Sequence, residues 1–361
     1  MIREADHPWL SRYALVTAVA GLVLICFGGL VTSHGAGMAV PDWPNTFGYN
    51  MFFFPVSRWV GGIFYEHTHR LAASGVGLMT MILAVWLWLK EPRKWLRWLG
   101  LIALVTVILQ GILGGLRVIL FKDELGIFHA TLAQLFFSLL CVIALATSRW
   151  WRFCESLQKR IIDVRGLRWT VLLAALLILT QLIVGATMRH QHAGLSIPDF
   201  PTAYGRWWPQ MDPSSVAEYN RNRVEVTPLN PITAFQIGLQ MSHRIIALFI
   251  LVAVVTVGAL ATRTLGVRHP LTRLATFWIG LILVQVLLGA ATIWTGKSAD
   301  IATTHVAIGA LSLMTGVVAA MIAFRVLAPR TVLAASHGEQ TPAAVPVMAG
   351  LGLASDSRRR I

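Results

Sequence analysis

Eight long apolar runs restrict the fold of this 361-residue chain more than any other feature. A helix needs about 20 consecutive apolar residues to span the hydrocarbon core of a bilayer. The mean hydropathy of +0.67 also indicates that the chain is solvated by lipid. The sequence therefore predicts an all-α integral membrane protein with eight transmembrane helices, over residues 11–33, 66–89, 97–119, 126–148, 168–188, 237–262, 272–295 and 302–327.

Lysine and arginine are concentrated in alternate connections between these helices. The connections near residues 90–97, 149–168 and 263–273 are rich in them, and the others are poorer for their length. By the positive-inside rule, the rich connections and both termini are cytoplasmic. Glu4 and Asp6 argue against an organelle transit peptide and favour a bacterial inner membrane. The net charge of +14 forms no single basic face with aromatics, so we expect no nucleic-acid partner.

An internal repeat divides the chain into two related halves. Residues 35–44, which contain Pro-Asp-Trp-Pro, align without gaps on residues 192–201, which contain Pro-Asp-Phe-Pro. Further along, the halves share matching histidines, His69 with His243 and His129 with His305. Each unit has an even number of helices, so we expect two parallel, pseudo-symmetric four-helix bundles.

The repeat predicts four parts. The N-terminal bundle covers residues 1–148, a cytoplasmic linker covers 149–166, the C-terminal bundle covers 167–328, and 329–361 form a disordered cytoplasmic tail. The cysteines lie in or beside helices, so we expect no structural disulfide among Cys26, Cys141 and Cys154.

Four histidines are the main candidates for a site, because ionisable residues inside a membrane are costly. His69, His129, His243 and His305 each lie near the start of a helix that enters from the outer side. Within a bundle, a histidine on the second helix and one on the fourth can supply the two axial nitrogens of a heme iron. The alternative is a helix-packing hydrogen bond. Zinc and di-iron sites fit less well because they need further ligands beside each pair.

One acidic residue distinguishes the two halves. Glu66 lies three residues before His69, on the same helical face, and the second half has Gln240 at the matching place. If both halves bind porphyrins, only the first has an acid/base group, which predicts chemistry there and electron transfer in the second half. Alternatively, Glu66 is an anion favoured by the dipole at a helix start.

Other polar residues admit two interpretations each. The guanidinium groups of Arg70 and Arg244 suit heme propionates, or they extend to the membrane interface. Gln110 and Gln285 are expected to form hydrogen bonds between helices. The Pro-Asp-aromatic-Pro segments are rigid connections or lids over a heme edge. Four more histidines are not assigned to the site: His67 has no counterpart, and His34, His190 and His192 are expected in outer loops.

In this order and on eight helices, the motifs resemble the heme A synthase family, in its cysteine-free branch typical of proteobacteria and mitochondria. The resemblance covers about residues 11–327. It is carried by Gly28-Gly29-Leu30-Val31, both Pro-Asp-aromatic-Pro segments, Glu66-x-x-His69-Arg70, His129-Ala130-Thr131, Ser242-His243-Arg244 and Thr304-His305.

The resemblance implies an oxidoreductase that converts the methyl group at ring position 8 of heme O to a formyl group, by successive hydroxylation and loss of water. It implies that His243 and His305 ligate a resident heme b and that His69 and His129 surround the substrate heme. Glu66 is then the acid/base or cation-stabilising group. Heme O synthase would supply the substrate, and the product would serve cytochrome oxidase. A quinone is a candidate electron acceptor, and a homo-oligomer is a candidate assembly.

Two other functions compete with this enzyme. A bis-histidine b-type cytochrome would pass electrons without substrate chemistry, but it has no need for Glu66 in one half only. A heme transporter or chaperone would more often have helices broken near the midplane, which these runs mostly lack.

Overall fold

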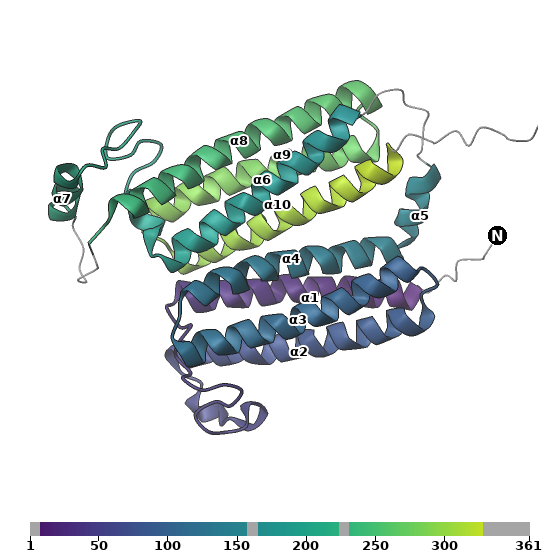
Figure 1. Ribbon diagram of the computed structural model, residues 1–361, viewed down its shortest axis with the longest axis horizontal. Helices are drawn as coiled ribbons and strands as arrows, with labels where there is room; N and C mark the ends of the chain where they lie inside the picture. Colours follow the sequence, from purple (N-terminus) through teal and green to yellow (C-terminus); the bar gives the residue numbers. More distant parts are fainter. Residues whose placement is uncertain (1–7, 157–164, 224–230, 328–361) are drawn as a thin grey trace, which may run out of the picture. The chain divides into compact units, whose positions relative to one another are not determined.

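The computed structural model describes residues 8–156, 165–223 and 231–327, which are mostly helical and contain no β-strand. By length and composition, eight helices of the described residues can cross a membrane, as the sequence predicts (Figure 1). They are α1 (Pro8–Ser33), α2 (Gly61–Lys90), α3 (Lys94–Leu120), α4 (Glu124–Thr147), α6 (Arg165–His190), α8 (Ala234–Leu265), α9 (Pro270–Trp294) and α10 (Ala299–Val326). Two shorter helices, α5 (Arg149–Ser156) and α7 (Pro213–Arg221), and three 3-10 turns complete the helical structure of the described residues.

Most spanning helices extend a few residues beyond the apolar runs. α2 begins at Gly61 and not at residue 66, and α8 begins at Ala234 and not at residue 237. Because backbone near lipid must satisfy its own hydrogen bonds, a helix continues past its last apolar residue. The start of α8 is fixed by a capping box in which the side chains of Thr233 and Gln236 each accept a hydrogen bond from the other's backbone N–H.

The packing of the spanning helices is compatible with two four-helix bundles. In the first, α2 and α4 each pack against α1 and α3, so α2 and α4 lie diagonally. In the second, α8 and α10 each pack against α6 and α9 in the same way. Each bundle has its own apolar core, built around Leu83, Leu87 and Leu140 in the first and around Val254, Trp278 and Leu313 in the second.

The two bundles pack against each other through α1, α4, α6 and α10 (Figure 1). Ile25, Phe137 and Ala310 form an apolar cluster between them. Near the end of α6, the guanidinium group of Arg189 donates hydrogen bonds to the carbonyl oxygen of Gly29 at 2.7 Å and to Oγ of Ser33 at 2.6 Å. A partly buried arginine thus joins the second bundle to α1.

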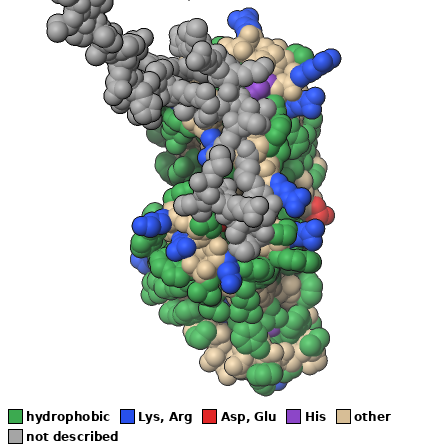
Figure 2. All heavy atoms as spheres, turned by 90° about the vertical axis from the view of Figure 1, so that its right-hand side faces the viewer, with side chains coloured by type: hydrophobic (Ala, Val, Ile, Leu, Met, Phe, Trp, Pro, Cys, Tyr) green, Lys and Arg blue, Asp and Glu red, His purple; other side chains and the backbone are tan. Residues whose placement is uncertain are grey.

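Basic side chains gather at one end of the molecule. Figure 2 looks onto that end, where Lys and Arg side chains outnumber acidic ones on the visible described surface. The connections between α2 and α3 and between α8 and α9 supply Lys90, Arg93, Lys94, Arg268 and Arg273. The predicted linker contains α5, a helix that the sequence does not predict, and α6 already begins at Arg165. The predicted tail, 329–361, lies outside the described residues.

Candidate functional site

Two loops with the same hydrogen bonds precede α2 and α8. We call residues 40–49 the first proline loop and residues 197–206 the second proline loop. In each, the aspartate accepts hydrogen bonds from the backbone N–H groups five and six residues further along, at 2.8 and 2.8 Å for Asp42 and at 2.7 and 2.9 Å for Asp199. Phe47 and Tyr204, at matching places, both have positive φ (50° and 53°). The repeat seen in the sequence is therefore also a repeat of loop structure.

The hydrogen bonds around Asp199 determine its ionisation. Burial by itself raises the pKa of this carboxyl, but hydrogen bonds from the Thr202 hydroxyl and from the N–H groups of Gly205 and Tyr204 outweigh burial. The net effect is a lowered pKa, because these donors stabilise the carboxylate. The second proline loop thus contains a carboxylate that helps to hold its turn.

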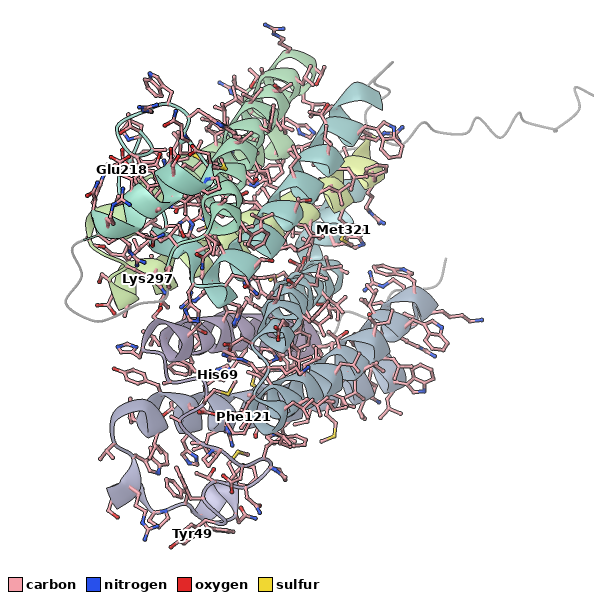
Figure 3. All side chains as sticks on the ribbon, turned by 60° about the vertical axis from the view of Figure 1, so that its left-hand side comes forward. Tyr49, His69, Phe121, Glu218, Lys297 and Met321 are labelled. Atoms are coloured by element: carbon pink, nitrogen blue, oxygen red, sulfur yellow. The ribbon has the colours of Figure 1, made fainter. Side chains whose placement is uncertain are left out.

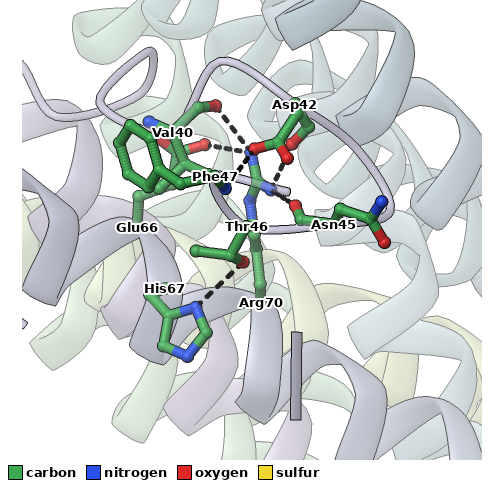
Figure 4. Close-up of polar contacts among 8 residues, drawn as sticks. All are labelled: Val40, Asp42, Asn45, Thr46, Phe47, Glu66, His67 and Arg70. Carbon is green, nitrogen blue, oxygen red and sulfur yellow. Dashed lines mark hydrogen bonds and ion pairs between the residues drawn. The ribbon is translucent and has the colours of Figure 1, made fainter. Parts of the chain in front are cut away.

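Arg70 and Arg244 direct their guanidinium groups at the proline loops. Arg70 donates to the carbonyl oxygens of Val40, Asp42 and Asn45 at 3.0, 2.7 and 3.1 Å (Figure 4). Arg244 donates to the carbonyl oxygens of Asp199 and Thr202 at 2.7 and 2.8 Å. Both arginines therefore fix a proline loop by hydrogen bonds to its carbonyl oxygens, and propionate binding by either one stays a prediction.

Glu66 and Gln240 occupy matching places and bind the same loop atom. Oε2 of Glu66 accepts a hydrogen bond from the N–H of Val40 at 2.9 Å, and Oε1 accepts one from Arg70 at 2.6 Å (Figure 4). Oε1 of Gln240 accepts a hydrogen bond from the N–H of Ile197 at 2.7 Å. Both side chains are buried, with 4% and 2% of their residue surface exposed. The carboxylate is thus ion-paired and part of a loop anchor.

The four candidate histidines lie on the diagonal helices of the bundles. His69 is on α2, inside the first bundle (Figure 3), and His129 is on α4. His243 is on α8 and His305 is on α10, and their ring centroids are 6.5 Å apart. All four Nδ1 atoms are buried without a hydrogen-bond partner. Because the two histidines of each pair lie on diagonal helices, the space between them is inside the bundle.

The geometry of the second pair fits a bis-histidine heme. A metal–imidazole bond is about 2 Å long, so two imidazoles on opposite faces of one iron have ring centroids roughly 6 Å apart. The 6.5 Å between His243 and His305 agrees with this separation. A neutral imidazole offers a metal the lone pair of one ring nitrogen, and Nδ1 of each ring is buried without a side-chain partner, so neither ring is held by another side chain. Within the described residues, no group of three His, Cys, Asp or Glu side chains could hold a metal ion.

Glutamines fix the backbone at one histidine of each half. Nε2 of Gln110 on α3 donates to the carbonyl oxygen of His129 at 3.1 Å, which confirms the predicted bond between helices. Nε2 of Gln181 on α6 donates to the carbonyl oxygen of His243 at 2.9 Å. The repeat in the sequence does not predict Gln181, because α1 has no glutamine at the matching place. Oε1 of Gln285 is buried without a hydrogen-bond partner.

The remaining histidines lie outside the two pairs. His67 is fully buried and hydrogen-bonds Thr46 through Nδ1 at 3.2 Å, and His34 stacks on Tyr65 with 4.0 Å between ring centroids. The prediction that His190 lies in a loop is wrong. It is the last residue of α6 and packs against Gly126 of α4, because α6 continues two residues beyond the apolar run.

Comparison with known proteins places the chain in a family. A family model for cytochrome oxidase assembly proteins (COX15-CtaA) matches residues 49–317. The chain is 24% identical to the heme A synthase of Shouchella clausii, over 80% of this chain and 88% of that protein. It is 24% identical to the heme A synthase of Geobacillus kaustophilus (92% and 98% covered) and 28% identical to that of Rhizorhabdus wittichii (84% and 91% covered). Because the family model matches well over half of the sequence, this chain belongs to the COX15-CtaA family of cytochrome oxidase assembly proteins.

Proposed function

We propose that this chain is a heme A synthase, an oxidoreductase that converts the ring-position-8 methyl group of heme O to a formyl group by successive hydroxylation and loss of water. The observation that carries the proposal is the combination of two histidine pairs, each with buried Nδ1 atoms, and a carboxylate beside only one of the pairs. The similar proteins named heme A synthase support the same activity.

In the proposed division of labour, the first bundle binds the substrate. His69 and His129 on its diagonal helices hold heme O. Arg70 binds the heme propionates or holds the first proline loop over the porphyrin. Glu66 lies on the same helical face as His69, within reach of a group bound there. Its carboxylate takes up or releases the proton of the reacting carbon, or stabilises positive charge on it. Arg70, paired with Glu66 at 2.6 Å, keeps the carboxylate in place.

The second bundle holds the cofactor. His243 and His305 would ligate heme b. Arg244 would bind its propionates or hold the second proline loop above it. Bound there, heme b supplies one-electron transfer. Gln240 cannot exchange a proton at neutral pH, so the second site is suited to carrying electrons without acid/base chemistry. A quinone in the bilayer is the acceptor class that we expect.

The proposed setting is a bacterial inner membrane with both termini in the cytoplasm. The basic connections at one end of the bundles support this orientation. Both histidine pairs then lie near the outer side, and heme O, delivered by heme O synthase, would reach the first pair from the bilayer.

The decisive experiment replaces Glu66 with glutamine in membranes that also contain heme O synthase. Gln240 shows that glutamine can bind the loop N–H at this position, so Glu66→Gln removes the charge and retains the anchor. We expect formyl heme in extracts to fall at least about 100-fold, because general acid–base groups contribute that much. The low-spin heme spectrum should persist.

Two controls interpret the result. His243→Ala and His305→Ala should each remove the low-spin spectrum. Wild-type formyl-heme production by the Glu66→Gln variant would refute the role of Glu66, and a wild type that yields only hemes B and O would favour the b-type cytochrome.

A further inference from the structure

Each of the four candidate histidines lies with its ring against a glycine of the preceding spanning helix. An ideal β-carbon built on that glycine would approach Cε1 of the ring to between 3.1 and 3.4 Å. The pairs are Gly28 with His69 (3.1 Å), Gly114 with His129 (3.3 Å), Gly185 with His243 (3.3 Å) and Gly289 with His305 (3.4 Å). The same ring atom meets the same residue type four times, on α1, α3, α6 and α9.

These approaches leave little room for a side chain. Carbon atoms in optimal contact are about 3.5–4.0 Å apart, so a β-carbon on Gly28, Gly114 or Gly185 would push the imidazole by some tenths of an ångström. A β-carbon on Gly289, at 3.4 Å, would come to the near limit of ordinary contact, and a larger side chain would pass it. Not every helical glycine is so placed. Gly111 on α3 and Gly280 on α9 would meet nothing within 4 Å if they carried a β-carbon. Therefore only some of the glycines in these helices lie in close contact with a histidine ring.

The same helix faces also hold the histidine backbone. Gln110 and Gly114 are four residues apart on α3, as are Gln181 and Gly185 on α6, so each pair points to one side of its helix. In both cases the glutamine binds the backbone carbonyl of the histidine whose ring touches the glycine. Helix α9 repeats this spacing with Gln285 and Gly289. Helix α1 has Leu24 four residues before Gly28 and departs from the pattern.

We propose that Gly28, Gly114, Gly185 and Gly289 are positioning residues that set the ring orientation of the four heme-binding histidines. The inference rests on the proposed function, because it assigns the glycines to histidines that ligate heme. In each ring Cε1 lies against a glycine and the neighbouring Nδ1 is buried without a partner, so the glycine limits how far the ring can turn between the helices. A ligand of this kind must be held within about 0.5 Å of its working position.

The test compares two substitutions on one helix. Gly289→Ala adds a methyl group against the His305 ring, and Gly280→Ala adds the same group to an open face of α9. The full-length chain is purified in detergent, and its low-spin heme is measured by absorbance per protein and by electron paramagnetic resonance. We expect Gly289→Ala to lower the heme-to-protein ratio at least about twofold, or to shift the low-spin signal. Gly280→Ala should match the wild type.

Replacing Gly289 with a larger residue tests whether heme loss increases with side-chain size, and the yield of full-length protein shows whether the variant still folds. Alanine favours helix more than glycine does, so loss of heme in Gly289→Ala would not follow from a weaker helix. Gly289→Val should reduce heme further, while the yield of full-length protein stays near that of Gly280→Val. Equal heme content and equal spectra in the variants at residues 289 and 280 would overturn the inference.

The first bundle gives an independent arm. Gly114→Ala should lower formyl-heme production and leave the resident low-spin spectrum unchanged, and Gly111→Ala on the same helix should change neither. Failure of the proposed function looks different from failure of this inference. If the proposed function is wrong, the wild type makes no formyl heme, but the variants at residues 289 and 280 still differ in their spectra.

Discussion

A neutral side chain performs the anchoring role of Glu66 in the other half of the molecule. Gln240 accepts a hydrogen bond from the N–H of Ile197, as Glu66 does from Val40. Anchoring a proline loop therefore does not require a charge. A buried carboxylate is costly unless it is paired, and here Arg70 pairs with it. Anchoring alone therefore gives no reason for a carboxyl group at residue 66, whereas the proposed chemistry on a bound group does.

The lowered pKa of Asp199 predicts a pH-dependent contribution to stability. A folded-state pKa below the ordinary value of 3.8 means that this contribution is present above that value and is lost as the pH falls through the folded pKa. We expect Asp199→Asn to lower the Tm at pH 7, and the gap to the wild type to close below the ordinary pKa. Thr202→Val, which removes one of the donors, should give a smaller gap. A gap that is the same at all pH values would contradict this.

At this scale the sequence predicts which residues are polar and buried but not what they bind. Arg70 follows His69 directly, and this spacing allows its guanidinium group to meet a propionate or a loop. Only the folded chain shows three loop carbonyls around it. In contrast, the equivalence of Glu66 and Gln240 could be predicted, because the two halves of a repeated sequence can be aligned with each other.

The long helices are determined by apolar length, and the short ones by local contacts. All eight spanning helices are predictable, because lipid allows an apolar run few alternatives to helix. α5 and α7 are not, because each is too short to show a clear period and depends on its surroundings. α7 begins at an Asp212 cap, and its Tyr219 stacks on Tyr204 of the second proline loop with 3.6 Å between ring centroids.

The second proline loop should loosen when its arginine is removed. Arg244→Leu deletes two charge-assisted hydrogen bonds to loop carbonyls, each worth about 1.5–3 kcal/mol when well shielded from water. Because the side chain is only partly buried, we expect the lower end of that range. Hydrogen–deuterium exchange of residues 198–206 should accelerate about tenfold. Arg268→Leu, in the connection between α8 and α9, is the matched control. Unchanged exchange in the loop would show that other contacts hold it.

At the scale of the whole molecule, the two bundles are joined by helices that face both. α1, α4, α6 and α10 pack across the boundary, and the repeat does not predict this, because each half could pack by itself. The close approach of Gly29 to Thr303 and the hydrogen bonds of Arg189 occur only there. No sequence comparison within the chain could reveal them, since Thr32 stands where the second half has Arg189.

Removing Arg189 should weaken the connection between the bundles. Arg189→Met retains much of the apolar stem and loses the hydrogen bonds to Gly29 and Ser33, at a cost of about 2 kcal/mol or more in a shielded site. Ser33→Ala, which removes one acceptor, should cost less. Denaturant unfolding in mixed micelles would measure both changes. Equal stability of Arg189→Met and the wild type would mean that apolar packing alone joins the halves.

The central position of α10 has a consequence for which substitutions the chain can accept. This helix packs against α1, α4, α5, α6 and α9, and among the spans of the described residues it has the largest buried share. Helices with lipid on one side accept exchanges among apolar residues of different size, whereas a helix surrounded by protein does not. In a saturation mutagenesis survey, α10 should therefore tolerate the fewest replacements per position, and the exposed side of α3, one of the two spans with the smallest buried share, should tolerate many more.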